Sequence, residues 1–334
     1  MRFLKRLFWQ LVCVAILAAG AVAGAAYWWL DQPLALASPS VEVSIEPKTT
    51  PRDAAQAWVQ AGVQTDARLL YEWFRWSGQA RKIRAGSYQV GTGVTPRTLL
   101  DKMVKGDEVM ASVRLIEGWT FRQFRAELAK APDLKQATAG MSEAELMAAI
   151  GAPGVRAEGR FYPDTYAFSK GASDLAVLKR AYRTMQRQLD AAWAERSPDT
   201  PLKSPDDLLK LASIVEKETG AAKDRGLVAG VFVNRLRIGM PLQTDPTVIY
   251  GLGERFDGNL RKIDLQTDGP YNTYLRGGLP PTPISMPGRA SLLAAVRPDK
   301  TRALYFVAKG DGSSHFSESL AEHNRAVNQY QLKR

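Results

Sequence analysis

The sequence predicts an α+β fold made of an N-terminal transmembrane helix, a small α+β module and a larger C-terminal mixed α+β domain. Three observations lead to this prediction. Residues 7–30 form one long apolar run without charge. Residues 41–117 alternate strand-like and helix-like patterns. Residues 205–334 place Gly, Pro, Asn and Asp between short apolar runs, which is typical of loops built on a scaffold.

Composition excludes several classes of protein. The chain of 334 residues is 45% hydrophobic and 24% charged, so it is neither disordered nor collagen-like. The one cysteine, Cys13, excludes a disulfide framework and a cysteine-rich zinc site. The two histidines, His315 and His323, lack metal-ligand spacing, and we expect both to make structural hydrogen bonds. We therefore expect neither a metal nor a cofactor.

The chain is basic, with a net charge of +11. The three basic residues of segment 1–6 account for three charges, and 11 − 3 leaves +8 for the part from residue 31 onward. A basic body predicts a polyanionic neighbour, which could be nucleic acid, a membrane surface or an anionic polymer. The alternative is that the charge only aids solubility, and composition does not choose between them.

Residues 7–30 are long enough to cross a membrane. The 24-residue run spans a hydrocarbon core of roughly 30 Å at about 1.5 Å per residue. Basic residues lie within segment 1–6 and Asp31 follows the run, so the positive-inside rule predicts a cytoplasmic N-terminus and an exported body. We therefore expect a single-pass protein of a bacterial inner membrane with its main part in the periplasm. This location argues against nucleic acid as a partner.

A cleaved signal peptide is the alternative interpretation of the same segment. Residues 35–37, Ala-Leu-Ala, resemble a small-residue cleavage site. They lie well beyond the apolar run, however, and that run is longer than the about 7–15 residues of a signal peptide's apolar region. We therefore favour an uncleaved anchor, followed by a linker at residues 31–40 that is rich in Pro, Ala and Ser.

Residues 41–117 predict a compact α+β module. Val41, Val43 and Ile45 alternate with polar residues, as in a half-buried strand. Threonines followed by proline or acidic residues then mark helix starts, and glycines mark helix ends. We expect strands at 41–45, 88–90 and 109–116, and helices that follow Thr50, Thr65 and Thr95 and end near Gly62, Gly78 and Gly106.

The larger domain is expected over residues 118–334. Thr120 and Gln123 form a capping box, which predicts a helix through about Lys130. Apolar spacing predicts a long helix from Ser173 to about Glu195. We also expect helical structure over residues 131–158.

The helix that begins after Ser204 carries the strongest catalytic candidate. Ser204, Pro205 and Asp207 combine an N-cap, an N1 proline and a capping-box acid, and the helix should end near Thr219. At about 100° per residue its apolar side chains share one arc, and Glu218 projects roughly 50° from the centre of that arc. The sequence thus places a carboxyl group on the apolar side of a helix C-terminus.

This position should raise the pKa of Glu218. Burial disfavours the carboxylate, and so does the negative end of the helix dipole. A carboxyl group that stays protonated near neutral pH can act as a general acid. The alternative is that Glu218 caps the helix or pairs with Arg225 or Arg235, because structural ion pairs also perturb pKa values.

Several sequence blocks resemble those of one enzyme family. The segment ASIVEKET at 212–219 is similar to the core motif of the YceG-like endolytic murein transglycosylases. Further blocks match in the same order along the chain. They are GRFYPDTY at 159–166, NRL at 234–236, GM at 239–240, LQTDPTV at 242–248, YG at 250–251, YNTY at 271–274, GLPP at 278–281, LYFVA at 304–308 and HN at 323–324.

The resemblance implies an activity. The family cleaves peptidoglycan glycan strands between N-acetylmuramic acid (MurNAc) and N-acetylglucosamine (GlcNAc), without water, and leaves a 1,6-anhydro-muramyl end. Its catalytic glutamate aligns with Glu218. One acid can suffice, because the muramyl C6 hydroxyl replaces the activated water that ordinary glycosidases need. The resemblance also implies that the module at 41–117 is LysM-like and that the protein works near peptidoglycan synthases.

Two of the blocks suit substrate binding, since they offer amides, hydroxyls and aromatic rings to a sugar. Each has a structural alternative: the first can be a plain turn, and the tyrosines can be core residues. The expected substrate-binding residues are Gln243, Thr244, Asp245, Tyr271, Asn272, Thr273 and Tyr274.

Two other functions stay open at this point. A non-enzymatic wall-binding scaffold would use the LysM-like module and lack catalysis. A hydrolytic muramidase would use Asp245 or Glu216 as a second carboxylate and would leave a reducing end.

Overall fold

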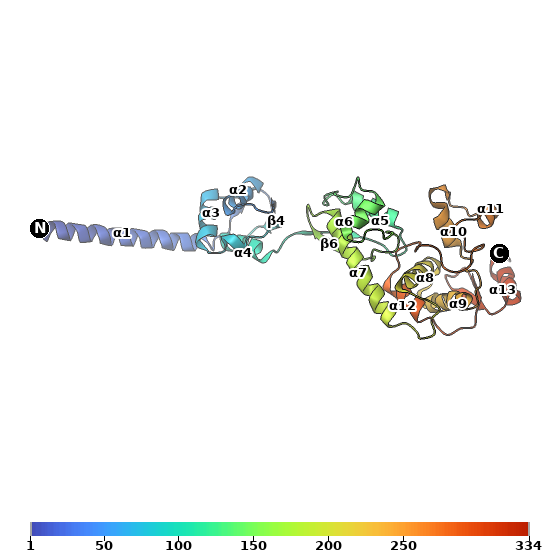
Figure 1. Ribbon diagram of the computed structural model, residues 1–334. Helices are drawn as coiled ribbons and strands as arrows, with labels where there is room; N and C mark the ends of the chain where they lie inside the picture. The colour runs from blue at the N-terminus through green and yellow to red at the C-terminus, as the bar shows by residue number, and fades with distance from the viewer. Residues whose placement is uncertain (1, 333–334) are drawn as a thin grey trace. The chain divides into compact units, whose positions relative to one another are not determined.

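The computed structural model describes residues 2–332, whose helices and strands form two compact units (Figure 1). The first unit runs up to Ala111 and also includes Ala167–Lys170. The second comprises Ser112–Tyr166 and the chain from Gly171 onward. Both units combine helices with short strands, which confirms the predicted α+β class.

Helix α1 (Arg2–Trp29) precedes the first unit's strands. Its segment Trp9–Trp29 has 21 residues and a mean hydropathy of 2.0, and none of it is buried. Large apolar side chains stand exposed along it, with Leu17 at 73% and Val22 at 70%. At about 1.5 Å per residue such a helix spans a hydrocarbon core. It therefore fits the predicted single-pass anchor.

The first unit is built on an antiparallel strand pair, β2 (Ser40–Ile45) with β4 (Gly86–Gly91). Val43 lies opposite Tyr88. Alternate residues of β2 are buried, as the sequence predicts, so one face of the pair forms the core. A second antiparallel pair joins β1 (Ala35–Leu36) and β3 (Val63–Gln64).

Three capped helices complete this unit. The Thr50 side chain accepts a hydrogen bond from the Asp53 N–H, and Thr95 forms a capping box with Thr98, as expected for helix starts. The predicted elements are present in order as β2, α2, α3 and β4, with the two-residue strand β3 inserted between the two helices. That the module is LysM-like stays a prediction. The helices are α2 (Pro51–Ala61), α3 (Ala67–Trp76) and α4 (Pro96–Lys105), with a 3-10 turn at Ala80–Lys82.

Strands β5 (Met110–Arg114) and β6 (Thr165–Ser169) pair with each other, and the division between the units passes through both. Helix α5 (Phe121–Lys130) starts with the predicted capping box of Thr120 and Gln123. Helix α7 (Asp174–Ala194) matches the predicted long helix.

The expected helical structure over residues 131–158 is largely wrong. Only α6 (Glu143–Ile150) is helical there. Gly151 and Gly154 adopt positive φ angles of 100° and 78°, a left-handed conformation that ends a helix. Pro132 and Pro153 further restrict the backbone on either side of α6.

The second unit's core surrounds α8 (Pro205–Glu218), which packs against α7, α9 (Arg225–Arg237) and α12 (Arg289–Val296) (Figure 1). The predicted apolar arc of α8 is fully buried, including Leu211, Ile214 and Val215. The helix ends at Glu218, where the Thr219 N–H and hydroxyl both donate to the Val215 carbonyl.

The remaining elements surround the end of α8 or follow it in the chain. Strands β7 and β8 form an antiparallel hairpin, with Val307 opposite His315. The elements are α10 (Asp245–Leu252), α11 (Lys262–Gln266), β7 (Tyr305–Ala308), β8 (Ser314–Ser317), α13 (Leu320–Val327), 3-10 turns at Ala222–Asp224 and Gly253–Arg255, and a π-helical turn at Asn328–Leu332.

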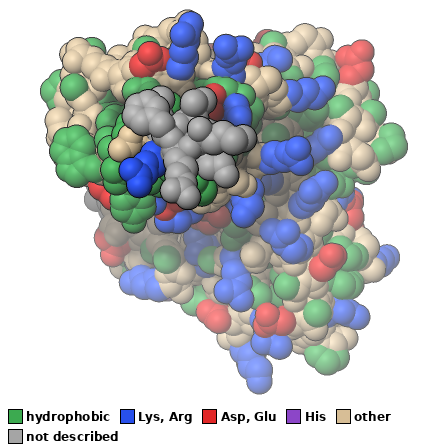
Figure 2. All heavy atoms as spheres, turned by 90° about the vertical axis from the view of Figure 1, so that its left-hand side faces the viewer, with side chains coloured by type: hydrophobic (Ala, Val, Ile, Leu, Met, Phe, Trp, Pro, Cys, Tyr) green, Lys and Arg blue, Asp and Glu red, His purple; other side chains and the backbone are tan. Residues whose placement is uncertain are grey.

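Lys and Arg side chains are exposed on the face of the molecule that Figure 2 shows. On the face drawn in Figure 2, Lys and Arg side chains are scattered rather than gathered into a single stripe. The net charge of +11 attracts a polyanion in general.

Candidate functional site

Glu218 lies in a pocket of about 280 Å³ in the second unit. The pocket brings together the end of α8, the segment that leads into α10, strand β7 and helix α13. Its lining combines carboxyl, guanidinium, phenol and imidazole groups. The lining residues are Glu218, Arg235, Leu242, Gln243, Asp245, Tyr274, Tyr305, Phe306, Leu320 and His323.

The surroundings of Glu218 favour its protonated form. Burial raises the pKa of this carboxyl group, and the nearby charge of Asp245 raises it further. A hydrogen bond from Thr244 and the positive charge of Arg235 both act to lower the pKa, but the net shift is upward. The predicted direction of the shift is therefore confirmed, and burial is its main cause.

The hydroxyl of Thr244 donates a hydrogen bond to Oε1 of Glu218. Thr244 is only 2% exposed, and two further threonines hold it in place. Its N–H donates to Oγ1 of Thr273 at 3.1 Å, and its carbonyl accepts from the Thr247 hydroxyl at 2.8 Å. This network fixes the orientation of the carboxyl group.

Gln243 enters the pocket from a strained backbone conformation. Its φ angle is 49°, in the left-handed region that costs a non-glycine residue about 1 kcal/mol or more. The Gln243 N–H donates to the Thr273 carbonyl at 3.0 Å, which holds the conformation. Strain of this kind is often stored at functional sites.

Asp245 and Tyr274 form a bonded pair on the pocket wall. The Tyr274 hydroxyl donates to Oδ1 of Asp245 at 2.6 Å. Burial raises the pKa of Tyr274, and the bond to Asp245 raises it further, so the phenol keeps its proton. The pair therefore presents one carboxylate and one neutral phenol beside Glu218.

Four of the predicted substrate-binding residues do not line this pocket: Thr244, which lies behind Glu218, and three residues of the segment 271–274. Thr273 lies behind Thr244. Asn272 is 4% exposed, and its amide donates to backbone carbonyls of residues 264–267. The Tyr271 ring packs edge-on against Tyr250 at 4.9 Å. These three side chains support the loop that carries Tyr274.

Six lining residues were not predicted as site residues, and three of them, Arg235, Tyr305 and His323, carry polar groups. Arg235 is 7% exposed, and its guanidinium donates to the carbonyls of Leu304 (2.7 Å) and Leu242 (2.6 Å). It also lies over the Tyr305 ring, 5.2 Å from the centroid. His323 does not make the expected structural hydrogen bond, because its Nδ1 is buried without a partner. All three lie in the recognised blocks 234–236, 304–308 and 323–324, and those blocks were the signal for them.

Glu216 points elsewhere. Its Oε2 accepts a hydrogen bond from the Gly288 N–H at 2.9 Å, and it does not line the pocket of Glu218. Of the two carboxylates considered as a second catalytic acid, only Asp245 shares the pocket. Among residues 2–332, no cluster of three or more His, Cys, Asp or Glu side chains could hold a metal ion.

A second buried carboxyl group lies at the far end of α10. Glu158 is 8% exposed and accepts hydrogen bonds from the Phe121 N–H at 3.1 Å and the Tyr250 hydroxyl at 3.2 Å. Burial raises the pKa of Glu158 to about 7. Its bond to the first residue of α5 gives it a structural role at that helix start.

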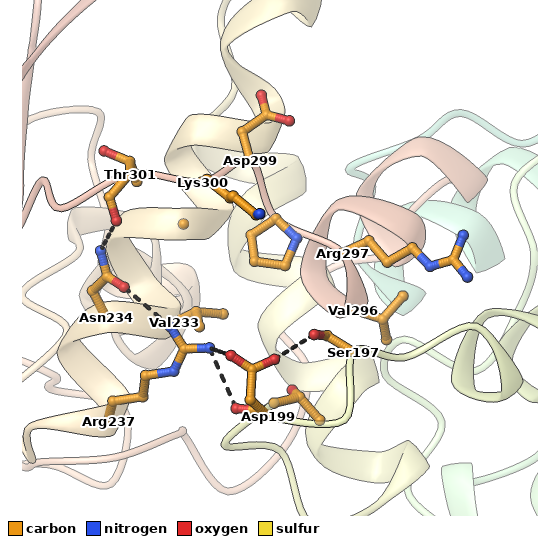
Figure 3. Close-up of a pocket in the computed structure, with 13 residues that line it drawn as sticks. Ser197, Asp199, Val233, Asn234, Arg237, Val296, Arg297, Asp299, Lys300 and Thr301 are labelled. Carbon is orange, nitrogen blue, oxygen red and sulfur yellow. Dashed lines mark hydrogen bonds and ion pairs between the residues drawn. The ribbon is translucent and has the colours of Figure 1, made fainter.

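A further cavity of about 320 Å³ lies between α9 and the segment that follows α12 (Figure 3). Some of its polar side chains are bonded. Arg237 pairs with Asp199 at 2.8 Å, Ser197 donates to Asp199, and Asn234 donates to the Thr301 carbonyl at 2.9 Å. Asp299 and Lys300 also line the cavity and are not part of these bonds.

Comparison with known proteins identifies the family. The model of the YceG-like family matches residues 43–329. The endolytic murein transglycosylase of Bacillus subtilis (strain 168) is 41% identical over 174 residues, which cover 52% of this chain and 48% of that protein. The endolytic murein transglycosylase of Streptococcus pneumoniae serotype 2 is 27% identical over 355 aligned positions, which cover 95% of this chain and 63% of that protein. The matched parts thus span about half to two thirds of these relatives.

A solved structure agrees with this result. The crystal structure of a yceG-like protein from Listeria monocytogenes superposes with a TM-score of 0.55 and 30% identity, and covers 86% of this chain and 98% of that one. Since the family model covers most of the chain, the protein belongs to the YceG-like family.

Proposed function

We propose that this protein is a membrane-anchored endolytic lytic transglycosylase, a lyase that cleaves MurNAc–GlcNAc bonds in nascent peptidoglycan strands and leaves 1,6-anhydro-MurNAc ends. The observation that carries the proposal is Glu218, a carboxyl group with a raised pKa at the wall of a polar pocket. The relatives named endolytic murein transglycosylases support the same activity.

The reaction needs one acid that later acts as a base. Protonated Glu218 donates its proton to the glycosidic oxygen, the bond from C1 to that oxygen breaks, and GlcNAc leaves as an alcohol. The C6 hydroxyl of the same MurNAc attacks C1 and loses its proton to the Glu218 carboxylate. The carboxyl group is thereby restored and no water is consumed.

The environment of Glu218 suits both of its protonation states. Burial keeps the carboxyl group protonated before the reaction. Once the proton has left, the Thr244 hydroxyl and the Arg235 charge stabilise the carboxylate. Glu218 can therefore act first as a general acid and then as a general base, because the pocket stabilises both its protonated and its ionised form.

The expected sugar contacts divide into two groups. Gln243, Asp245 and Tyr274 line the pocket and offer an amide, a carboxylate and a phenol to hydroxyl and acetamido groups. Thr244 orients Glu218. We assign Tyr271, Asn272 and Thr273 the task of holding these residues in place.

The anchor fits a site of action outside the cytoplasm. Helix α1 would hold the protein in the inner membrane with its N-terminus cytoplasmic, because the basic residues precede the apolar run. Glycan strands would then be reached soon after synthesis, and peptidoglycan synthases are the expected neighbours. Co-purification without any synthase would count against that partner.

One observation favours a second candidate function. Asp245 lines the same pocket as Glu218, so it could activate a water molecule and make the protein a hydrolytic muramidase. The products separate the two, because hydrolysis leaves a reducing MurNAc end.

The test is product analysis with the full-length protein in detergent and uncrosslinked glycan strands. Mass spectrometry of the products should find anhydro-MurNAc ends with the native protein and none with the Glu218→Gln variant. Reducing ends would establish the muramidase instead. Binding of strands without cleavage by the native protein would favour a scaffold role.

A further inference from the structure

His323 faces the pocket of Glu218 but has no role in the reaction as proposed so far. It comes from helix α13, more than a hundred residues along the chain from Glu218, and lines the same 280 Å³ pocket. The inference that follows rests on the proposed function, since it concerns substrate binding in that pocket.

The ring of His323 is held rigidly. It stacks on Tyr305, with centroids 5.2 Å apart and planes at 23°. The other neighbour of Tyr305 is the guanidinium of Arg235, 5.2 Å from the ring centroid. Two backbone carbonyls fix Arg235 in turn, at 2.6 and 2.7 Å. The three side chains form one ordered wall of the pocket.

One ring nitrogen of His323 is not used by the protein. Nδ1 is buried and has no hydrogen-bond partner. Burial lowers the pKa of His323, and the positive charge of Arg235 lowers it further, so the imidazole is neutral at neutral pH. A neutral imidazole carries one N–H and one acceptor nitrogen. A proton on the enclosed Nδ1 would leave a buried donor unpaired, so the proton belongs on Nε2.

Packing alone does not explain a histidine here. A phenylalanine would stack on Tyr305 equally well and would bury no unsatisfied nitrogen. A histidine at this position is explained if its other ring nitrogen, Nε2, bonds to a ligand that enters the pocket, because that bond offsets the cost of the unsatisfied Nδ1. Among the groups on a glycan strand, hydroxyl and acetamido oxygens accept hydrogen bonds from a neutral N–H.

We infer that His323 is a substrate-binding residue whose Nε2–H donates a hydrogen bond to a hydroxyl or acetamido oxygen of the glycan in the Glu218 pocket. Its contribution is to affinity and to the position of the sugar. It transfers no proton in the reaction.

The test is calorimetric binding of a purified GlcNAc–MurNAc tetrasaccharide to full-length protein in detergent. All variants carry Glu218→Gln, so that the probe is not cleaved. Adding His323→Phe keeps the stacked ring and removes the nitrogens, and should weaken binding about three- to tenfold. Adding His323→Gln, whose amide nitrogen can replace Nε2–H, should restore part of the loss.

A matched control is His315→Phe. His315 lies in β8, its ring 5.7 Å from that of Tyr330, and it does not line the pocket, so its replacement should leave affinity unchanged. Equal affinity of the His323→Phe protein and its parent would overturn the inference. So would equal losses from both histidine replacements, or no binding of the probe at all.

Cleavage by the native protein is scored separately, which keeps the two proposals distinguishable. Loss of binding with His323→Phe in a protein that never cleaves glycan would support the inference and reject the transglycosylase. If the native protein cleaves glycan but His323→Phe leaves the binding affinity unchanged, the transglycosylase is supported and the role of His323 is rejected.

Discussion

Two cavities of similar size in the second unit differ in what their polar groups do. In the 320 Å³ cavity of Figure 3, Arg237, Asp199 and Ser197 bond to one another. In the 280 Å³ pocket, the pKa of Glu218 is raised, and Nδ1 of His323 has no hydrogen-bond partner. Burial raises the pKa of Glu218, whereas a hydrogen bond from Ser197 lowers the pKa of Asp199. The difference teaches that the two cavities are separated by the pKa of their carboxyl groups more than by their volume.

The largest expected contrast comes from one carboxyl group in each cavity. Glu218→Gln should lower the rate of glycan cleavage by about 10²–10⁴-fold, because it removes the general acid. Asp199→Asn should change the rate by less than about twofold, since its ion pair with Arg237 is largely exposed. Rates are measured on uncrosslinked glycan, with thermal unfolding as the check on folding. A large loss of activity from Asp199→Asn would break the comparison.

Thr244 offers a way to sharpen the role of Glu218. Its hydroxyl lowers the pKa of Glu218, so Thr244→Val should raise that pKa and leave the carboxylate less stabilised. An acid is active while protonated, and activity therefore falls as pH rises through its pKa. We expect a rate about tenfold lower for Thr244→Val, consistent with loss of a hydrogen bond to a charged group. The alkaline limb of its kcat/KM profile should move to higher pH.

Thr244→Ser is the matched control, because it keeps the hydroxyl. It should retain the native pH profile. A shift of the limb to lower pH in Thr244→Val would contradict the assignment of Glu218 as the acid that titrates there.

Glu158 should affect stability and not the reaction. Its pKa is raised from 4.5 to about 7 in the folded protein. The stability that depends on its protonation is fully present below pH 4.5 and is lost as pH rises through about 7. The loss is on the order of 1–3 kcal/mol. Glu158→Gln should therefore flatten the fall in melting temperature between pH 5 and 8, and an unchanged slope would reject this account.

The smallest expected effect lies beside the cavity of Figure 3. A Cβ on Gly230 of α9 would lie 2.7 Å from Cγ2 of Thr301 and 2.9 Å from the Asp299 carbonyl oxygen. Gly230→Ala should thus lower stability by about 1 kcal/mol or more through overpacking, despite the better helix propensity of alanine. Calorimetric unfolding measures the loss. Higher stability, or a marked fall in activity per folded molecule, would contradict the view that this region is only structural.

Local patterns predicted α8, the helix that carries Glu218, whereas α9, α10, β7 and α13 were not predicted within the loop-like segment 205–334. Ser204 and Pro205 predicted where α8 begins, and the apolar spacing predicted the buried arc and the position of Glu218. These features depend on neighbours within a few residues, which a sequence displays directly.

The other walls of the pocket depend on long-range packing. Arg235, Tyr305 and His323 come from α9, β7 and α13, and only the folded chain brings them together. Asn272 shows the converse, because an amide expected to face a sugar is consumed by backbone carbonyls of its own loop. Composition and spacing do not reveal which polar side chains will form hydrogen bonds to the backbone in the folded protein.

The most direct test of the central claim is cleavage of glycan strands in water enriched in ¹⁸O. If Glu218 acts alone and the C6 hydroxyl attacks C1, the new MurNAc ends will be anhydro forms that contain no ¹⁸O from the solvent. New MurNAc ends that carry a solvent-derived oxygen at C1 would contradict the account, because they would show that water and a second catalytic group complete the reaction.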